Sequence, residues 1–212
     1  PRRTAILAEV ASRVALGGSL QSTLDDLCRS VVDATGAVSA AVAMTDEETG
    51  LQRMVGTCNL PEGYPEALNS ILETGTLMLA QPAFEGRRAA LVREMRRKVL
   101  DAPAYAPLHT FMRQVEWDSI LAVPMIYRGQ PMGVLLGYYL PGRSLSADEI
   151  GLCMAIADQA AVAVENARLV KQVQGKAALE ERQRLARELH DSVSQALYSI
   201  ALNAAAAGQS LQ

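Results

Sequence analysis

Apolar residues recur every three or four positions in two sets within the first 36 residues, which predicts two amphipathic helices. The first set is Ile6, Leu7, Val10 and Val14, and the second is Leu20, Leu24, Leu27 and Val31. Gly17 ends the first helix, because glycine readily adopts the backbone conformation of a helix C-terminus. Ser19 caps the second helix, which closes near Gly36.

The hydrophobic pattern then changes to short apolar or alternating runs, which predict two β-hairpins. The strand pairs are 37–44 with 51–58, joined by a turn at 46–50, and 119–127 with 131–140, joined at 128–130. Pro124 has no backbone N–H, so its strand is expected at an edge of the sheet or at a bulge. Residues 61–118, between the hairpins, carry several prolines and mixed helical patterns.

The last third of the chain predicts one long helix. Ser146 and Glu149 form a capping box, in which each side chain satisfies an orphan backbone N–H at a helix start. No proline follows, and Ala, Leu, Glu and Arg dominate as far as Ala207. Such a helix would be about 90 Å long. It requires a packing partner, because isolated helices have little stability in water.

Two apolar stripes of coiled-coil or bundle type run along this helix. One is Ile156, Ala160, Ala163, Ala167 and Val170, and the other is Ala186, Leu189, Val193, Ala196 and Ile200. The two stripes are out of phase, so local unwinding or a bend is expected between Gly175 and Arg184. We hypothesise a signalling hinge there, with an ordinary junction between two packed units as the alternative.

Composition excludes several classes of function. A net charge of −3 and a pI near 5.5 give no general attraction for nucleic acid. Three separated cysteines and two histidines offer neither a disulfide framework nor metal-ligand spacing. The absence of a membrane-span pattern and of a signal peptide favours a cytoplasmic chain. Because the sequence opens at Pro1, we expect a piece of a longer protein, which could reach a membrane through other segments.

One histidine has a setting suited to chemistry. His190 directly follows the stripe residue Leu189, so it lies beside the apolar seam and can face water. A neutral imidazole nitrogen is a nucleophile, and the ordinary pKa of histidine, about 6.5, provides it at physiological pH. Asp191 can orient the ring or take its proton, and Gln195 lies one turn beyond Asp191. The alternative is an ordinary surface histidine.

The segment 181–195, ERQRLARELHDSVSQ, resembles the phosphoacceptor box of NarL-type sensor histidine kinases. This resemblance implies a homodimer built on a four-helix bundle. His190 would accept the γ-phosphoryl group of ATP from the protein's own, separate ATP-binding domain. It would then pass the group to an aspartate of a NarL/LuxR-type response regulator. Asp191 would act as general base in autophosphorylation, and Gln195 would position water for dephosphorylation of the regulator.

The order of helices and hairpins is similar to a GAF domain, with strands such as SILAVPM and GVLLGYY. The resemblance implies an α+β fold with a central antiparallel sheet, flanked by helices and followed by the long helix. We therefore expect a GAF-like sensory domain at 1–172 and the first helix of the dimerisation and phosphoacceptor domain at 173–212. Without an ATP-binding domain, this piece alone should be inactive.

GAF domains hold ligands in a pocket on one side of the sheet, covered here by residues 61–118. In some related kinases a histidine in this pocket binds haem, and His109 is the only candidate ligand; a loop or capping histidine is the alternative. No motif for a cyclic nucleotide or a bilin is present, and an empty, protein-contacting domain is a further alternative. The basic residues between Arg87 and Lys98, which flank Leu91, Met95 and Val99, predict a helix with a solvated face or an anion site.

A second class of function is a non-catalytic GAF scaffold that binds a ligand and dimerises through its tail. A scaffold needs the apolar seam but has no use for an exposed His190-Asp191 pair followed by Gln195. A phosphodiesterase would need a metal-binding or phosphate-binding constellation, which the sequence lacks.

Overall fold

Antiparallel pairing joins five strands into one sheet in the order β2-β1-β5-β4-β3. The strands are β1 (Ser39–Thr45), β2 (Gln52–Cys58), β3 (Ala90–Val92), β4 (Ser119–Tyr127) and β5 (Gln130–Tyr139). The pairs β1/β2 and β4/β5 are the two predicted hairpins, which the structure confirms. The three-residue strand β3 was not predicted from the sequence.

The structure is a computed structural model of the 212-residue chain, and it describes residues 19–46 and 48–209. Within the last helix, side chains are described as far as 190, apart from 171 and 177–180. The predicted helix before Gly17 lies outside the described residues. The chain divides into a first unit that ends at Glu165 and a second unit that starts at Asn166.

The β4–β5 hairpin combines a tight turn with a proline, Pro124, inside strand β4. Arg128 and Gly129 both have positive φ, 48° and 78°. Positive φ at both residues is what a tight two-residue hairpin turn requires. β3 pairs with β4 only from Ile120 to Ala122, so Pro124 lies past the end of β3. The register of β4 also shifts directly after Met125. Pro124 therefore lies where one side of β4 is an open edge, as expected, and the bulge begins one residue further on.

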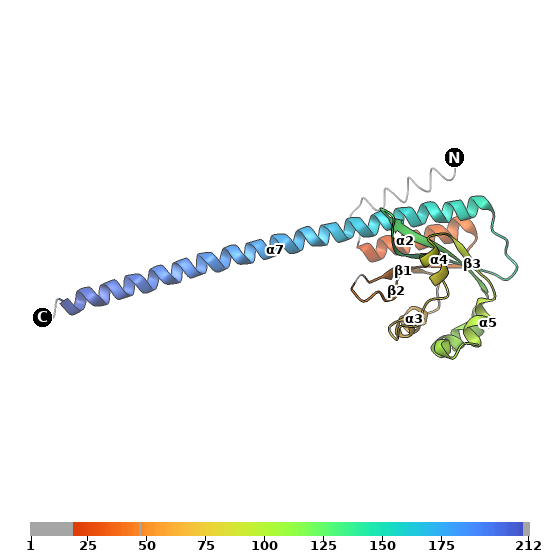
Figure 1. Cartoon of the computed structure of the whole chain (residues 1–212), viewed down its shortest axis with the longest axis horizontal. Helices are drawn as coiled ribbons and strands as arrows, with labels where there is room; N and C mark the ends of the chain where they lie inside the picture. The colour runs from red at the N-terminus through yellow and green to blue at the C-terminus, as the bar shows by residue number, and fades with distance from the viewer. Residues whose placement is uncertain (1–18, 47, 210–212) are drawn as a thin grey trace. The chain divides into compact units, whose positions relative to one another are not determined.

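Helix α2 (Leu20–Thr35) and the first part of α7 (Ala147–Gln209) cover one face of the sheet (Figure 1). Ser19 caps α2 as predicted, because its hydroxyl accepts a hydrogen bond from Ser22 N at 3.2 Å. Gly36 ends α2 with a φ of 67°. The fully buried residues on this face include Cys28, Val31, Val42, Ile156 and Ala160.

The opposite face is covered by the segment between the hairpins (Figure 1). Its elements are α3 (Tyr64–Leu72), α4 (Gln81–Gly86), α5 (Met95–Leu100), the 3-10 helix η1 (Pro103–Leu108) and α6 (His109–Gln114). The expectation of one helix across the basic residues was wrong. Arg87 ends α4, Leu91 lies in β3, and only Met95 to Leu100 form a helix.

Helix α7 is the predicted long helix, with 63 residues. The backbone is helical at every position from Gly175 to Arg184, so the unwinding expected from the two apolar stripes is not present. The helix is continuous through the segment in which the apolar stripe changes from one phase to the other. Within the described part of the chain, no helix combines the length and the hydropathy of a membrane span.

Candidate functional site

The start of α7 is fixed by the predicted capping box. Ser146 N donates to Glu149 Oε2 at 2.8 Å, and Glu149 N donates to Ser146 Oγ at 3.2 Å. Arg143 extends this contact, because its Nη2 lies 2.5 Å from Glu149 Oε1 and 3.4 Å from Thr35 O. Hydrogen bonds from the Ser146 backbone and hydroxyl, with the Arg143 charge, lower the pKa of Glu149. The first turn of α7 is thereby tied to the end of α2.

A buried polar contact also links α7 to α2. Tyr139 OH lies 3.0 Å from Thr35 Oγ1 and 3.9 Å from Cys153 Sγ. Burial raises the pKa of Tyr139 well above its ordinary value, so the hydroxyl stays neutral. The contact joins α2, β5 and α7 inside the core.

The first apolar stripe of α7 is divided between two environments. Ile156 and Ala160 are fully buried, and both belong to the core that packs against the domain's own sheet. Val170, at the other end of the stripe, is 56% exposed. The sequence predicts this stripe as a seam between helices. In the structure, its first half instead packs α7 against the domain's own sheet. No contact among the described residues tests the coiled coil.

The candidate phosphoacceptor segment lies further along α7, where the side chains from Glu181 to His190 are all exposed. Arg184 lies between two carboxylates: its Nη2 is 2.6 Å from Glu181 Oε1, and its Nη1 bonds Glu188 Oε1. The hydrogen bond between Arg184 and Glu181 lowers the pKa of Glu181 and raises that of Arg184. This charge network was not predicted from the sequence, although the i,i+3 and i,i+4 spacing of these residues signals it.

His190 presents its imidazole to solvent on this helix, as predicted. Asp191 and Gln195 follow on the same helix, but their side chains lie outside the described residues. An exposed imidazole on a helix can be approached from solvent by another molecule. The chemistry that this part of the chain supports is nucleophilic attack by a ring nitrogen.

His109 lies in a different setting. It directly follows η1 and begins α6, and its Nε2 is 3.0 Å from the carbonyl oxygen of Val99. Because a carbonyl only accepts hydrogen bonds, this ring nitrogen carries the proton. The side chain is half-buried and links α6 to α5. This is the geometry of a capping or loop histidine.

The cover side of the sheet, where GAF domains hold their ligands, is occupied by aromatic side chains. The Tyr64 ring centroid lies 5.9 Å from that of Trp117, and the Trp117 centroid lies 4.6 Å from that of Tyr138. Burial raises the pKa of both the Tyr64 and the Tyr138 hydroxyls. Phe111 adds a further edge contact to Tyr64, at 5.7 Å. These contacts give the cover side a packed interior.

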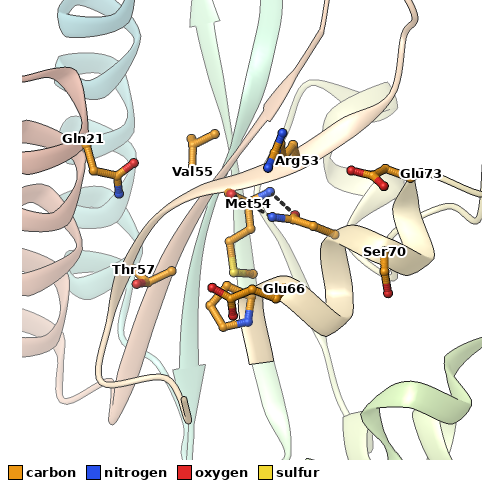
Figure 2. A pocket seen from close by; sticks show the side chains of 10 residues that line it. Gln21, Arg53, Met54, Val55, Thr57, Glu66, Ser70 and Glu73 are labelled. Carbon is orange, nitrogen blue, oxygen red and sulfur yellow. Dashed lines mark hydrogen bonds between the residues drawn. The ribbon is translucent and has the colours of Figure 1, made fainter. Parts of the chain in front are cut away.

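A groove of about 640 Å³ lies over the edge strand β2, between the start of α2 and α3 (Figure 2). Asn69 satisfies the outward-facing backbone groups of Met54 in this strand: its Oδ1 accepts from Met54 N at 2.7 Å, and its Nδ2 donates to Met54 O at 3.2 Å. Asp25 accepts from Thr57 N at 2.8 Å. These side chains occupy backbone groups that could otherwise pair with another strand.

The charged side chains around this groove are all solvent-exposed. Arg53 extends from β2, while Glu66 and Glu73 extend from α3 (Figure 2). The groove is an open polar surface on the edge of the sheet. Neither histidine lies in it.

Comparisons with known proteins agree with this architecture. Residues 18–165 match the GAF domain family, and residues 181–212 match the family described as histidine kinase. The chain is 27% identical over 204 residues to the sensor histidine kinase YhcY of Bacillus subtilis (strain 168). That match covers 95% of this chain and 52% of YhcY, so the chain spans about half the length of this relative.

Solved GAF domains share the fold. One is the GAF domain of a phosphoenolpyruvate-protein phosphotransferase from Coxiella burnetii, with a TM-score of 0.62, 18% identity and coverage of 80% of this chain and 96% of that one. Another is the phycoerythrobilin-bound GAF domain of a cyanobacterial phytochrome, with a TM-score of 0.58, 15% identity and coverage of 80% and 97%. The chain belongs to the GAF-domain family, and its C-terminal segment is similar to the histidine kinase family.

Proposed function

We propose that this chain is the input and phosphoacceptor part of a two-component sensor kinase. Its GAF domain receives a signal, and His190 accepts a phosphoryl group from ATP and passes it to an aspartate of a NarL/LuxR-type response regulator. The observation that carries the proposal is the exposed His190 on α7, within the segment that matches the histidine kinase family. We place this activity in the cytoplasm, where ATP and response regulators are found.

The acceptor chemistry follows from the residues around His190. A neutral ring nitrogen attacks the γ-phosphorus of ATP, and the bond from that phosphorus to the ADP oxygen breaks as ADP leaves. Asp191, as the neighbouring carboxylate, takes the proton from the other ring nitrogen. Gln195 orients the water that hydrolyses the phosphoaspartate of the regulator. These two roles rest on the resemblance of the segment to the NarL-type box.

ATP has to be delivered by a domain other than the GAF domain and α7. The curated relative is about twice as long as the matched region, which leaves room for an ATP-binding domain in proteins of this kind. We therefore expect the 212-residue chain to accept phosphate but not to catalyse its own phosphorylation.

A second copy of the chain is the proposed partner of α7. Beyond Asn166 the helix exposes large apolar side chains, namely Leu169, Val170, Val173 and Leu185. Exposed apolar groups repeated along one helix favour a helix–helix interface, and dimerisation removes them from water. A homodimer through this part of α7 supplies the bundle in which His190 acts.

The aromatic residues on the cover side of the sheet bear on the kind of signal that the GAF domain receives. The aromatic packing of Tyr64, Trp117 and Tyr138 favours an input that acts by contact with another protein segment, or by rearranging this packing. Haem ligation by His109 would require its ring to leave the Val99 carbonyl. A non-catalytic scaffold is the competing function, and it predicts no role for His190.

Labelling of the parent protein with γ-labelled ATP separates the two functions. The parent protein here means this chain together with its ATP-binding domain. We expect a label that acid removes and alkali does not, as for a phosphorus–nitrogen bond, and His190→Gln should abolish it. An absent label, or one that persists in the variant, would support the scaffold. Gln195→Ala should slow dephosphorylation of the regulator while leaving autophosphorylation largely intact.

A further inference from the structure

Two arginines of α7, three residues apart, differ in their charge environment. Arg184 is neutralised, because it contacts both Glu181 and Glu188. Arg187 makes a hydrogen bond from its Nε to the carbonyl oxygen of Gln183 at 3.3 Å. Among the described side chains, no carboxylate is paired with Arg187. The described carboxylates therefore leave the positive charge of Arg187 open to another anion.

Helical spacing places this charge next to the proposed phosphoacceptor. Arg187 precedes His190 by three residues and Asp191 by four, so the three share one face of α7. Side chains at this spacing have Cβ atoms about 5–6 Å apart. Both Arg187 and His190 are exposed, so the guanidinium can reach past the ring without losing its hydration. Arg184 lies on another flank of the helix, beside its two carboxylates.

We propose that Arg187 binds the phosphoryl group that His190 receives, as an electrostatic catalytic residue for phosphoryl transfer; this rests on the proposed function of His190. A guanidinium presents several N–H donors in a planar fork, which matches the oxygens of a phosphoryl group. The present bond to Gln183 O is long and uncharged at the acceptor, so a charge-assisted bond to the phosphoryl oxygens replaces it favourably. Positive charge placed where negative charge gathers during transfer lowers the barrier.

The 212-residue chain itself provides the test, with potassium phosphoramidate as a small anionic phosphate donor. A ring nitrogen of His190 attacks the phosphorus, the bond from phosphorus to nitrogen of the donor breaks, and ammonia leaves with the ring proton. The rate of phosphohistidine formation can be followed by phosphorus NMR. His190→Gln sets the background, and circular dichroism confirms that each variant keeps its helix.

We expect Arg187→Gln to slow the reaction about threefold at low salt, the effect of one charge about 6 Å away in water. Arg187→Lys should restore most of the rate. The difference between wild type and Arg187→Gln should shrink in molar salt, where charges are screened beyond about 3 Å. A merely structural role for Arg187 would show neither the rescue by lysine nor the salt dependence.

Arg184→Gln is the matched control, and it should change the rate less than Arg187→Gln does. Equal rates in wild type and Arg187→Gln, or an equal loss in Arg184→Gln, would overturn the proposal. ATP labelling of the parent protein is a separate arm: a wild-type protein that takes no label from ATP refutes the kinase function, whereas the phosphoramidate rates still decide the role of Arg187.

Discussion

The two stretches of α7 on either side of Glu165 place their large apolar side chains in opposite environments. Before this residue, Ile156 is fully buried against the sheet of its own domain. After it, Leu169 and Val173 are 47% and 67% exposed. The first stretch satisfies its apolar face within one chain, and the second has no such cover among the described residues. Helix α7 thus begins as part of the domain core and continues with exposed apolar side chains.

This difference separates two kinds of stability. Residues of the first stretch should determine the free energy of unfolding of the GAF domain. Residues of the second stretch should determine association between copies of the chain. Variants on the two sides of Glu165 should therefore affect different properties: folding on one side and association on the other.

The largest effect is expected from Leu169→Asp combined with Val173→Asp. Each substitution removes about 1.5–3 kcal/mol of apolar burial from the proposed interface and adds a charge, so the dissociation constant should rise roughly 100-fold or more. Sedimentation equilibrium measures this, and Gln172→Asp on an exposed polar position is the control. A wild-type chain that stays monomeric, or a double variant that associates as tightly as wild type, would contradict the proposed dimer.

A smaller effect, on folding rather than association, is expected from Ile156→Ala. This change opens a cavity between α7 and the sheet and should lower the free energy of unfolding by about 2–5 kcal/mol. Chemical denaturation of the chain measures it. Val162→Ala is the matched variant on the same helix, where the side chain is 42% exposed. The effect of Val162→Ala should stay within about 0.5 kcal/mol. Equal losses in both variants would show that Ile156 is not anchored as described.

Removal of the helix cap at the start of α7 should have a still smaller effect. Ser146→Ala deletes the hydroxyl that accepts from Glu149 N at 3.2 Å. Such caps contribute about 1 kcal/mol, and Ser146→Thr, which keeps a hydroxyl, should recover most of it. The same denaturation experiment compares the variants. A Ser146→Ala protein as stable as wild type would mean that water replaces the cap without loss.

The smallest expected effect is a pH dependence from Glu149. Hydrogen bonds from Ser146 and the charge of Arg143 lower its pKa in the folded chain below the ordinary value of 4.5. Glu149 therefore adds stability above about pH 4.5 that is lost as the pH falls through the folded pKa. Denaturation midpoints between mildly acidic and strongly acidic pH measure this loss. Glu149→Gln should remove this part of the pH dependence, and an unchanged profile would contradict the assignment.

Local signals made much of the fold predictable. The cap at Ser19, the stop at Gly36, the two hairpins and the capping box each depend on residues close together in sequence, and the structure confirms all of them. Strand β3 was missed because its three residues become a strand only by pairing with Ile120 to Ala122, far along the chain. The basic run was assigned to one helix for the same reason.

The candidate site was predictable to a similar extent. His190 stands in a contiguous motif, so its position on a helix and its exposure followed from the sequence. The burial of Ile156 and Ala160 against a sheet did not follow, because a stripe of helical period fits a sheet face as well as a partner helix. Similarly, the structure distinguishes Arg184, which lies between Glu181 and Glu188, from Arg187, which bonds the carbonyl oxygen of Gln183.

The most direct test of the proposed function is to locate the phosphate after incubation of the parent protein with ATP. The chain has two histidines: His109 is half-buried and bonded to Val99 O, and His190 is exposed on α7. Digestion at mildly alkaline pH and mass spectrometry distinguish the two peptides. We predict phosphate on the peptide with His190 and none on the peptide with His109. Phosphate on His109, or an acid-stable phosphate on another residue alone, would contradict the assignment of His190 as the phosphoacceptor.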